Sequence, residues 1–405
     1  MFLAAVALLP LHTVYLHAWI SWKPWIVLFA IVVIVQATDG WRKRTWPWHR
    51  AASIGLAVFM IAVAASWSGG DADRYLRLLL AVGLGGAVML VTERELRRPG
   101  MPEATMRAIY WSAAAMALTA LIFSLVAVGT FGGGAGEAIS RVPLLDRVTK
   151  EAYLANGFVA LTNWHQDPGY AAVWMNLWAV LAFLAIRRGL GANPALDAFV
   201  VGGLWFGVVM TLSRSGLLGL SVGVAVVLWM GRDDWRRSVS LVARAALAAV
   251  LLTAAVWALD RPDVGGDLAE AIEFRVRQGV SLGPGEGAGE PGTGVIDYRG
   301  NVWPIYWAFF KENPVRGAGL GAGWAAAGVQ EPHNLILELL GETGLLGLAG
   351  FAFLFLQAVR STASRVGAAA LVVALSTAAT QTVLFEASWW FAVGLMLAPP
   401  PARSP

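Results

Sequence analysis

Long apolar segments recur along this chain, separated by short stretches that carry charged residues, glycine or proline. About 20 apolar residues in helical conformation cross the hydrocarbon core of a bilayer. A single soluble core could not bury so many segments of this length. We therefore predict an all-α polytopic membrane protein with about 12 transmembrane helices. The predicted spans cover residues 2–20, 25–38, 51–68, 75–92, 106–131, 169–186, 195–212, 215–231, 238–259, 334–359, 366–383 and 387–398.

The amino-acid composition supports a membrane protein. Hydrophobic residues make up 58% of the chain and charged residues 14%, against about 25% charged residues in an ordinary globular domain. The 20 tryptophans suit the bilayer interface, where the indole ring is buried and its N–H stays hydrated. The chain has no cysteine, which excludes disulfides, thiolate metal ligands and a cysteine nucleophile. Residues 1–20 lack a basic leading segment and a convincing cleavage site, so we expect them to form the first span.

The positions of lysine and arginine predict the orientation in the membrane. Short loops rich in these residues stay in the cytoplasm. Basic loops follow the second, fourth, sixth, eighth and tenth predicted spans, so all of them lie on one side. This pattern predicts cytoplasmic N- and C-termini, and it puts two longer polar segments on the periplasmic side.

The same pattern divides the chain into three parts. Residues 1–259 hold transmembrane helices 1–9, with a periplasmic segment near 132–168. Residues 260–333 form a large helical periplasmic loop between spans 9 and 10, in which Tyr298–Lys311 is an amphipathic, Trp-rich helix. Residues 334–405 hold transmembrane helices 10–12 and a short cytoplasmic tail.

His333 is the first candidate for chemistry. It lies between Pro332 and Asn334, directly before an apolar run, and both neighbours are typical of a helix start. We expect His333 in the first turn of span 10, where the positive end of the helix dipole favours the neutral imidazole. A neutral histidine can act as a general base. The alternative reading is a structural histidine at the membrane interface.

Arginines on the same predicted side form the second candidate group. Guanidinium groups bind phosphate oxygens through two parallel hydrogen bonds, so arginines without neighbouring carboxylates predict a site for an anionic ligand. Alternatively, these side chains reach to the bilayer surface or bind lipid headgroups, and we assign the latter role to Lys311 and Arg316. The candidate diphosphate ligands are Arg214, Arg275, Arg277 and Arg299.

Nucleotide and metal motifs are weak in this sequence. The glycines of Gly317–Gly323 follow no strand and precede no Gly-Lys-Ser/Thr, so we expect close packing or sharp turns there, not a phosphate loop. Asp71 and Asp73 lie in a very short loop, which makes a metal site improbable. We predict no metal and no cofactor. His165 either lines an acceptor site or belongs to a turn, and we favour the turn.

Three blocks of residues resemble one known family. The first is Ser213-Arg214-Ser215-Gly216, placed after a span and before a long periplasmic loop. The second, Glu312–Gly319, resembles the short loop "NP-x-x-G-x-G". The third runs from His333 to Gly347 and resembles "H-N-x-x-L-x-x-x-x-E-x-G-x-x-G". In this order, the blocks are similar to the O-antigen ligase/polymerase superfamily, and the similarity covers about residues 200–360.

The resemblance implies a GT-C-like glycosyltransferase in the bacterial inner membrane, with its active site in the periplasm. An O-antigen ligase transfers O-antigen from undecaprenyl diphosphate to a sugar hydroxyl of the lipid A core, by metal-independent, inverting transfer. His333 would be the base and Arg214 would bind diphosphate together with Arg275 or Arg277 and with Arg299. Supporting or acceptor-side positions would be Asn334, Glu338, Arg147, Lys150 and His165. The expected partners are these two glycolipids and membrane lipids, without nucleic acid.

Other functions stay open at this point. An O-antigen polymerase uses the same donor with a growing lipid-linked chain as acceptor, and a protein-glycosylating oligosaccharyltransferase is a further relative. A transporter is less favoured, because transporters place their charged residues at mid-membrane near broken helices, whereas the notable charges here cluster in or beside loops on one predicted side.

Overall fold

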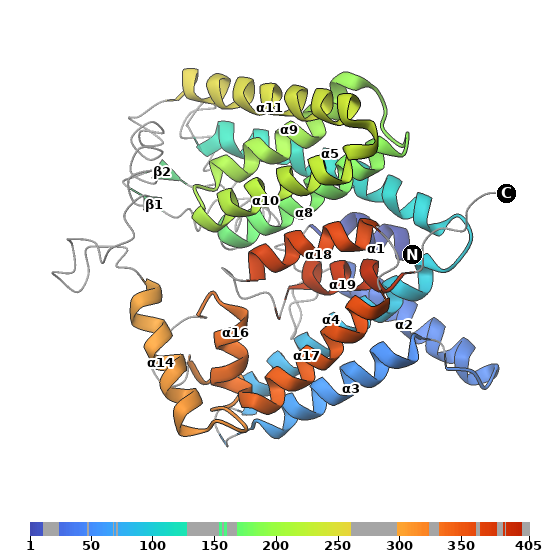
Figure 1. The fold of residues 1–405 in the computed structure, drawn as a ribbon, viewed down its shortest axis with the longest axis vertical. Helices are drawn as coiled ribbons and strands as arrows, with labels where there is room; N and C mark the ends of the chain where they lie inside the picture. Colours follow the sequence, from blue (N-terminus) through green and yellow to red (C-terminus); the bar gives the residue numbers. More distant parts are fainter. Residues whose placement is uncertain are drawn as a thin grey trace. The chain divides into compact units, whose positions relative to one another are not determined.

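The computed structural model describes residues 1–10, 24–46, 48–67, 69, 72–127, 154–155, 158–159, 168–260, 298–323, 332–361, 365–378, 384 and 386–398. Nearly all of these residues are helical, and a pair of two-residue strands, β1 (Leu154–Ala155) and β2 (Phe158–Val159), is antiparallel. A helix occurs within each of the twelve predicted segments. The chain forms two compact units (Figure 1), which we describe one at a time.

Six of the described helices are long and apolar enough to cross a membrane: Trp25–Arg42, Tyr75–Leu96, Met101–Leu125, Gly169–Arg187, Arg232–Ala258 and Leu335–Arg360. Shorter apolar helices cover Arg50–Ala65, Pro194–Met210, Ser215–Met230 and Val366–Ser376. These lengths and compositions agree with the predicted polytopic helical membrane protein. The count of 12 spans, the GT-C-like architecture and the three-part division stay predictions.

The first unit comprises residues 1–34, 95–278 and 368–376. Its helices are α1 (Phe2–Leu8), α5 (Met101–Ala127), α8 (Pro168–Arg187), α9 (Pro194–Met210), α10 (Arg214–Met230), the short 3-10 turn η1 (Arg232–Asp234), α11 (Trp235–Ala258) and most of α18 (Arg365–Ala378).

Helix α8 forms the centre of this unit. It packs against α5, α9 and α10, and 94% of its apolar stretch is buried, against 17% for the stretch that contains α11. The outer surface of α11 exposes large apolar side chains, among them Leu247, Val250 and Leu251. Acyl chains solvate such a surface, whereas water does not.

Small residues bring the helices of the first unit close together. On α9, Gly202 faces Ala245 of α11, Gly203 faces Ala117 of α5, and a side chain at either position would meet the neighbouring helix at less than normal contact distance. Close approach through small residues is the usual way in which helices associate in lipid. Apolar side chains gain little there by moving from lipid tails to a neighbouring helix, because both surroundings are apolar.

The second unit comprises residues 35–94, 279–367 and 377–405. Its helices are most of α2 (Pro24–Arg42), α3 (Arg50–Ala65), nearly all of α4 (Ala72–Leu96), α14 (Tyr298–Glu312), α16 (Leu335–Glu338), the π-turn η2 (Leu339–Thr343), α17 (Gly344–Ser361) and α19 (Ala387–Leu397).

Aromatic rings fill the core of the second unit. Phe351 of α17 contacts Phe59 of α3 edge-on, and it stacks on Trp389 of α19 with ring centroids 6.1 Å apart. The ring of Trp390 occupies the place that a side chain at Gly85 of α4 would need. Helix α17 therefore packs against both α3 and α19.

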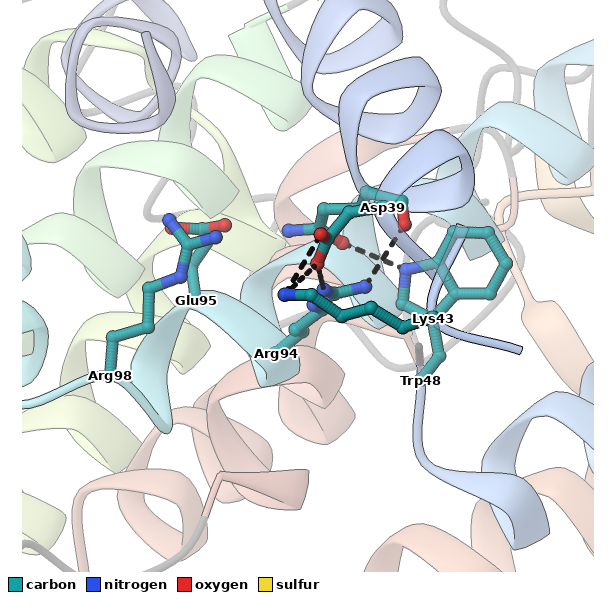
Figure 2. A network of polar contacts seen from close by, with 7 residues as sticks. Asp39, Lys43, Trp48, Arg94, Glu95 and Arg98 are labelled. Carbon is teal, nitrogen blue, oxygen red and sulfur yellow. Dashed lines mark hydrogen bonds and ion pairs between the residues drawn. The ribbon is translucent and has the colours of Figure 1, made fainter. Parts of the chain in front are cut away.

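An ionic cluster joins the end of α2 to α4 (Figure 2). Asp39 accepts hydrogen bonds from Lys43 at 3.1 Å and from Arg94 at 3.2 Å. Arg94 also donates to the carbonyl of Gln36, whose side-chain oxygen accepts the indole N–H of Trp48 at 2.8 Å. Since the side chain of Arg94 is only 17% exposed, its pair with Asp39 is screened less than a fully exposed ion pair. The cluster anchors the basic loop after α2.

We predicted span 10 as one continuous helix, but the structure shows an interrupted one. Helix α16 ends after one turn, the backbone continues as the π-turn η2, and α17 begins at Gly344 with a φ of 63°. A left-handed residue cannot continue an α-helix, so the predicted span is broken near its start.

Packing at the glycine contacts yields a stability prediction. Replacing Gly202 by Ala puts a Cβ into the backbone of Ala245 and 2.8 Å from the Cβ of Ala248, and such overpacking costs about 1–3 kcal/mol. At Gly223 of α10 the nearest atom, on Val180, is 3.4 Å away. We expect Gly202→Ala to lower the thermal unfolding midpoint in detergent and Gly223→Ala to leave it unchanged or raise it. Equal midpoints would contradict the packing argument.

Candidate functional site

His333 lies in a strained turn. Its φ is 49°, a left-handed conformation in which histidine is more frequent than most residues and which costs of the order of 1–3 kcal/mol. The side chain is half-buried. Helix α16 begins at Leu335, and the side chain of Asn334 caps it by accepting a hydrogen bond from the N–H of Leu337 at 3.0 Å. His333 therefore precedes the helix cap, and our placement of it in the first helical turn was wrong by two residues.

A tryptophan from α14 holds this turn. The indole N–H of Trp303 donates to the carbonyl oxygen of Pro332 at 2.9 Å. The next turn of α14 contributes Tyr306, which is fully buried and packs against Gly341 of η2. The helix that we predicted over 298–311 is thus confirmed as Tyr298–Glu312, and it supports the turn of His333 from the side.

Two buried glutamates follow His333. Glu338 closes α16 and Glu342 lies in η2, with exposed fractions of 2% and 3%. The hydroxyl of Tyr306 donates to Glu342 at 3.4 Å. Glu342 was absent from our predicted site residues, although it occupies the glutamate position of the third resembled block. Carboxylates buried in a membrane segment are costly and usually serve a function.

The second and third resembled blocks are joined by their backbones. The N–H groups of Ala318 and Gly319 donate to the carbonyls of Gly341 and Glu342, both at 2.9 Å. In return, Leu345 and Leu346 donate to the carbonyls of residues 314 and 315 at 2.9 and 3.1 Å. We call this contact between 314–319 and 341–346 the backbone clasp.

Glycine is required on both sides of the backbone clasp. Gly317 and Gly344 have φ values of 70° and 63°. A Cβ at Gly317 would overlap the backbone of Glu342, and one at Gly344 would overlap the backbone of Val315. The glycines of this loop therefore provide sharp turns and close packing, as we predicted from the sequence.

Arg214 is the first residue of α10, in the first unit. Leu212 precedes it with a φ of 50°, and Ser213 caps the helix by accepting the N–H of Gly216 at 3.2 Å. The hydroxyl groups of Ser213 and Ser215 are 2.8 Å apart. Backbone N–H groups at a helix start attract anions, and Arg214 is the first residue of this helix.

Asn176 of α8 stabilises the same turn. Its side-chain amide is 99% buried and donates to the carbonyl of Gly216 at 2.9 Å. We did not select Asn176 from the sequence, although a lone asparagine within the predicted apolar span 169–186 was a usable signal. No comparable signal distinguished Trp303 among 20 tryptophans.

The structure places the predicted site residues as follows. Arg214 belongs to the first unit, whereas His333, Asn334, Glu338 and Arg299, in the first turn of α14, belong to the second. Asp73, which we judged from the sequence to be an improbable metal ligand, pairs with Arg77 one helical turn away. Within the described part of the chain, no group of three or more histidine, aspartate or glutamate side chains is arranged to hold a metal ion. The positions outside the described residues are Arg147, Lys150, His165, Arg275 and Arg277.

Comparison with known proteins adds one match. The O-antigen ligase family model matches residues 198–352, a stretch that contains Arg214, the backbone clasp and His333. A comparison with curated proteins gives no match. The matched stretch holds all three resembled blocks in the family's order, and over these residues the chain is similar to the O-antigen ligase family.

Proposed function

We propose that this protein is an O-antigen ligase, which transfers O-antigen from undecaprenyl diphosphate to a sugar hydroxyl of the lipid A core at the periplasmic face of the inner membrane. The observation that carries the proposal is His333, held in a strained, capped turn within the stretch that matches the ligase family. The predicted orientation, with both termini in the cytoplasm and 12 spans, is part of the proposal.

The proposed reaction is a direct displacement. The imidazole of His333 accepts the proton of the acceptor hydroxyl, and the acceptor oxygen forms a bond to the anomeric carbon of the donor sugar. The bond between that carbon and the diphosphate oxygen breaks at the same time, so the configuration inverts. The lipid diphosphate leaves with the bonding electrons.

Arginine is suited to the leaving group. The diphosphate gains negative charge as it departs, and a guanidinium group neutralises that charge through paired N–H donors. Arg214 at the start of α10 has this role in the proposal, joined by Arg299 and by Arg275 or Arg277. In a low-dielectric surrounding such contacts strengthen.

The acceptor distinguishes the ligase from the other members of the superfamily. Purified protein incubated with lipid-linked O-antigen and rough lipopolysaccharide should convert the lipopolysaccharide into a ladder of O-antigen-bearing forms. A polymerase would instead lengthen the lipid-linked chain without using lipopolysaccharide, and an oligosaccharyltransferase would need a protein acceptor. Either result would overturn the ligase proposal but would still agree with the similarity to the superfamily.

Removing the imidazole should abolish transfer. We expect His333→Asn to lower kcat by about 10²–10⁴-fold, the usual contribution of a general base. Asparagine accepts the left-handed backbone of this position, so the turn is preserved. His333→Ala should also abolish transfer, but it adds backbone strain.

Donor binding separates loss of the base from misfolding. Both His333 variants should bind lipid-linked glycan with the affinity of the unmodified protein, measured by thermophoresis in detergent. Normal transfer by His333→Asn would exclude the general-base role.

Arg214→Lys tests the diphosphate contact. Lysine keeps the charge but lacks the planar, two-pronged donor arrangement, so most of the transfer activity should be lost. The matched control is Arg236→Lys, an exposed position near the start of α11, which should keep full activity. Full activity of Arg214→Lys would indicate that this side chain only reaches to the bilayer surface.

Chelation tests whether arginine is sufficient to stabilise the leaving group. If guanidinium groups neutralise the diphosphate, the initial rate of ladder formation should be the same in EDTA and in added Mg²⁺. A rate that falls in EDTA and recovers with Mg²⁺ would contradict metal-independent transfer.

A further inference from the structure

We propose that Trp303 is a positioning residue for the transfer reaction, because its indole N–H holds the turn that presents His333. This inference rests on the proposed function, since it assigns Trp303 to the same base. Trp303 touches no substrate in this proposal and acts through the backbone of Pro332.

The hydrogen bond acts directly next to the strained residue. Trp303 donates at 2.9 Å to the carbonyl of Pro332, and the peptide group that contains this carbonyl also contains the nitrogen of His333. The rotation of that peptide group sets φ of His333, which is 49°. A donor that fixes the carbonyl direction therefore favours the left-handed conformation over the more common ones.

The donor belongs to a well-anchored helix. Val302 and Tyr306 of α14 are buried, and a Cβ at Gly341 would lie 2.9 Å from the carbonyl oxygen of Tyr306, so α14 and η2 touch through their backbones. The backbone clasp also holds η2, through the N–H groups of residues 318 and 319. Trp303 extends from this frame to a turn 29 residues later in the chain.

Asn334 fixes only the other end of the turn. Its side chain caps α16, and its own φ of −155° is extended backbone. The cap holds the residue after His333 and the indole holds the residue before it. Without the indole bond, the His333 backbone can relax to an ordinary conformation, which redirects its side chain. Displacement of a catalytic group by about 1 Å can lower a rate by about 10²-fold.

Trp307 provides a matched control on the same helix. Trp303 and Trp307 are one turn apart in α14, with exposed fractions of 40% and 46%. The ring of Trp307 contacts Phe310 and lies on the outer surface of the helix. Phenylalanine at either position keeps an aromatic ring and removes the indole N–H.

The first experiment compares Trp303→Phe with Trp307→Phe in the purified transfer assay. We expect Trp303→Phe to lower kcat by about 10- to 100-fold, with the KM for donor within about twofold because arginines bind the diphosphate. Trp307→Phe should keep both values. Equal kcat for the two variants, or a loss confined to KM, would overturn the positioning role.

The second experiment measures the turn without using activity. Diethyl pyrocarbonate modifies accessible neutral imidazoles, and peptide mass spectrometry gives the rate at each histidine. Trp303→Phe should raise the modification rate of His333, while His49, the cap of α3, reacts at an unchanged rate in both variants. An unchanged modification rate at His333 would show that the Trp303–Pro332 hydrogen bond, which we call the tether, does not hold this turn.

The two experiments separate the two proposals. If the unmodified protein transfers no glycan but Trp303→Phe still changes His333 reactivity, the proposed function fails and the tether stands. If reactivity changes and kcat does not, the tether exists but Trp303 does not position the base.

Discussion

The backbone clasp between residues 314–319 and 341–346 is the constraint on which the second unit depends. The π-turn and the left-handed Gly344 interrupt the regular helical pattern, which leaves the carbonyls of Gly341 and Glu342 to find partners outside their own helix. In a membrane an unsatisfied backbone group costs several kcal/mol. The N–H groups of Ala318 and Gly319 satisfy these carbonyls, so loop and broken helix stabilise one another.

The position of the candidate base follows from this clasp. Because the clasp fixes η2, α14 packs on a rigid surface there, through the contact of Tyr306 with Gly341. A held α14 brings Trp303 to the carbonyl of Pro332, and the strained backbone of His333 comes next. Strain of this kind persists only where the surrounding structure enforces it. The glycines of the second resembled block thus support a histidine that is far from them in the chain.

The first unit follows a different principle. Its centre is α8, an almost fully buried helix, and its helices approach through glycine and alanine. A buried asparagine lies within this packing. Asn176 donates to Gly216 at the start of α10, where the unpaired backbone N–H groups of a helix gather. The result is a fixed, polar helix start that carries Arg214.

The sequence by itself determined the helical membrane class, the limits of most helices and the resembled blocks. Apolar length, helix caps such as Asn334 and glycine-rich turns act over one or two helical turns, so they can be recognised locally. Tertiary structure alone decided the break in span 10, the left-handed backbone of His333 and the partners Trp303 and Asn176. The backbone of His333 and the roles of Trp303 and Asn176 depend on hydrogen bonds between residues 29 and 40 positions apart, and the break in span 10 goes with the backbone clasp. No local pattern specifies which distant donor will reach a given carbonyl once the helices pack.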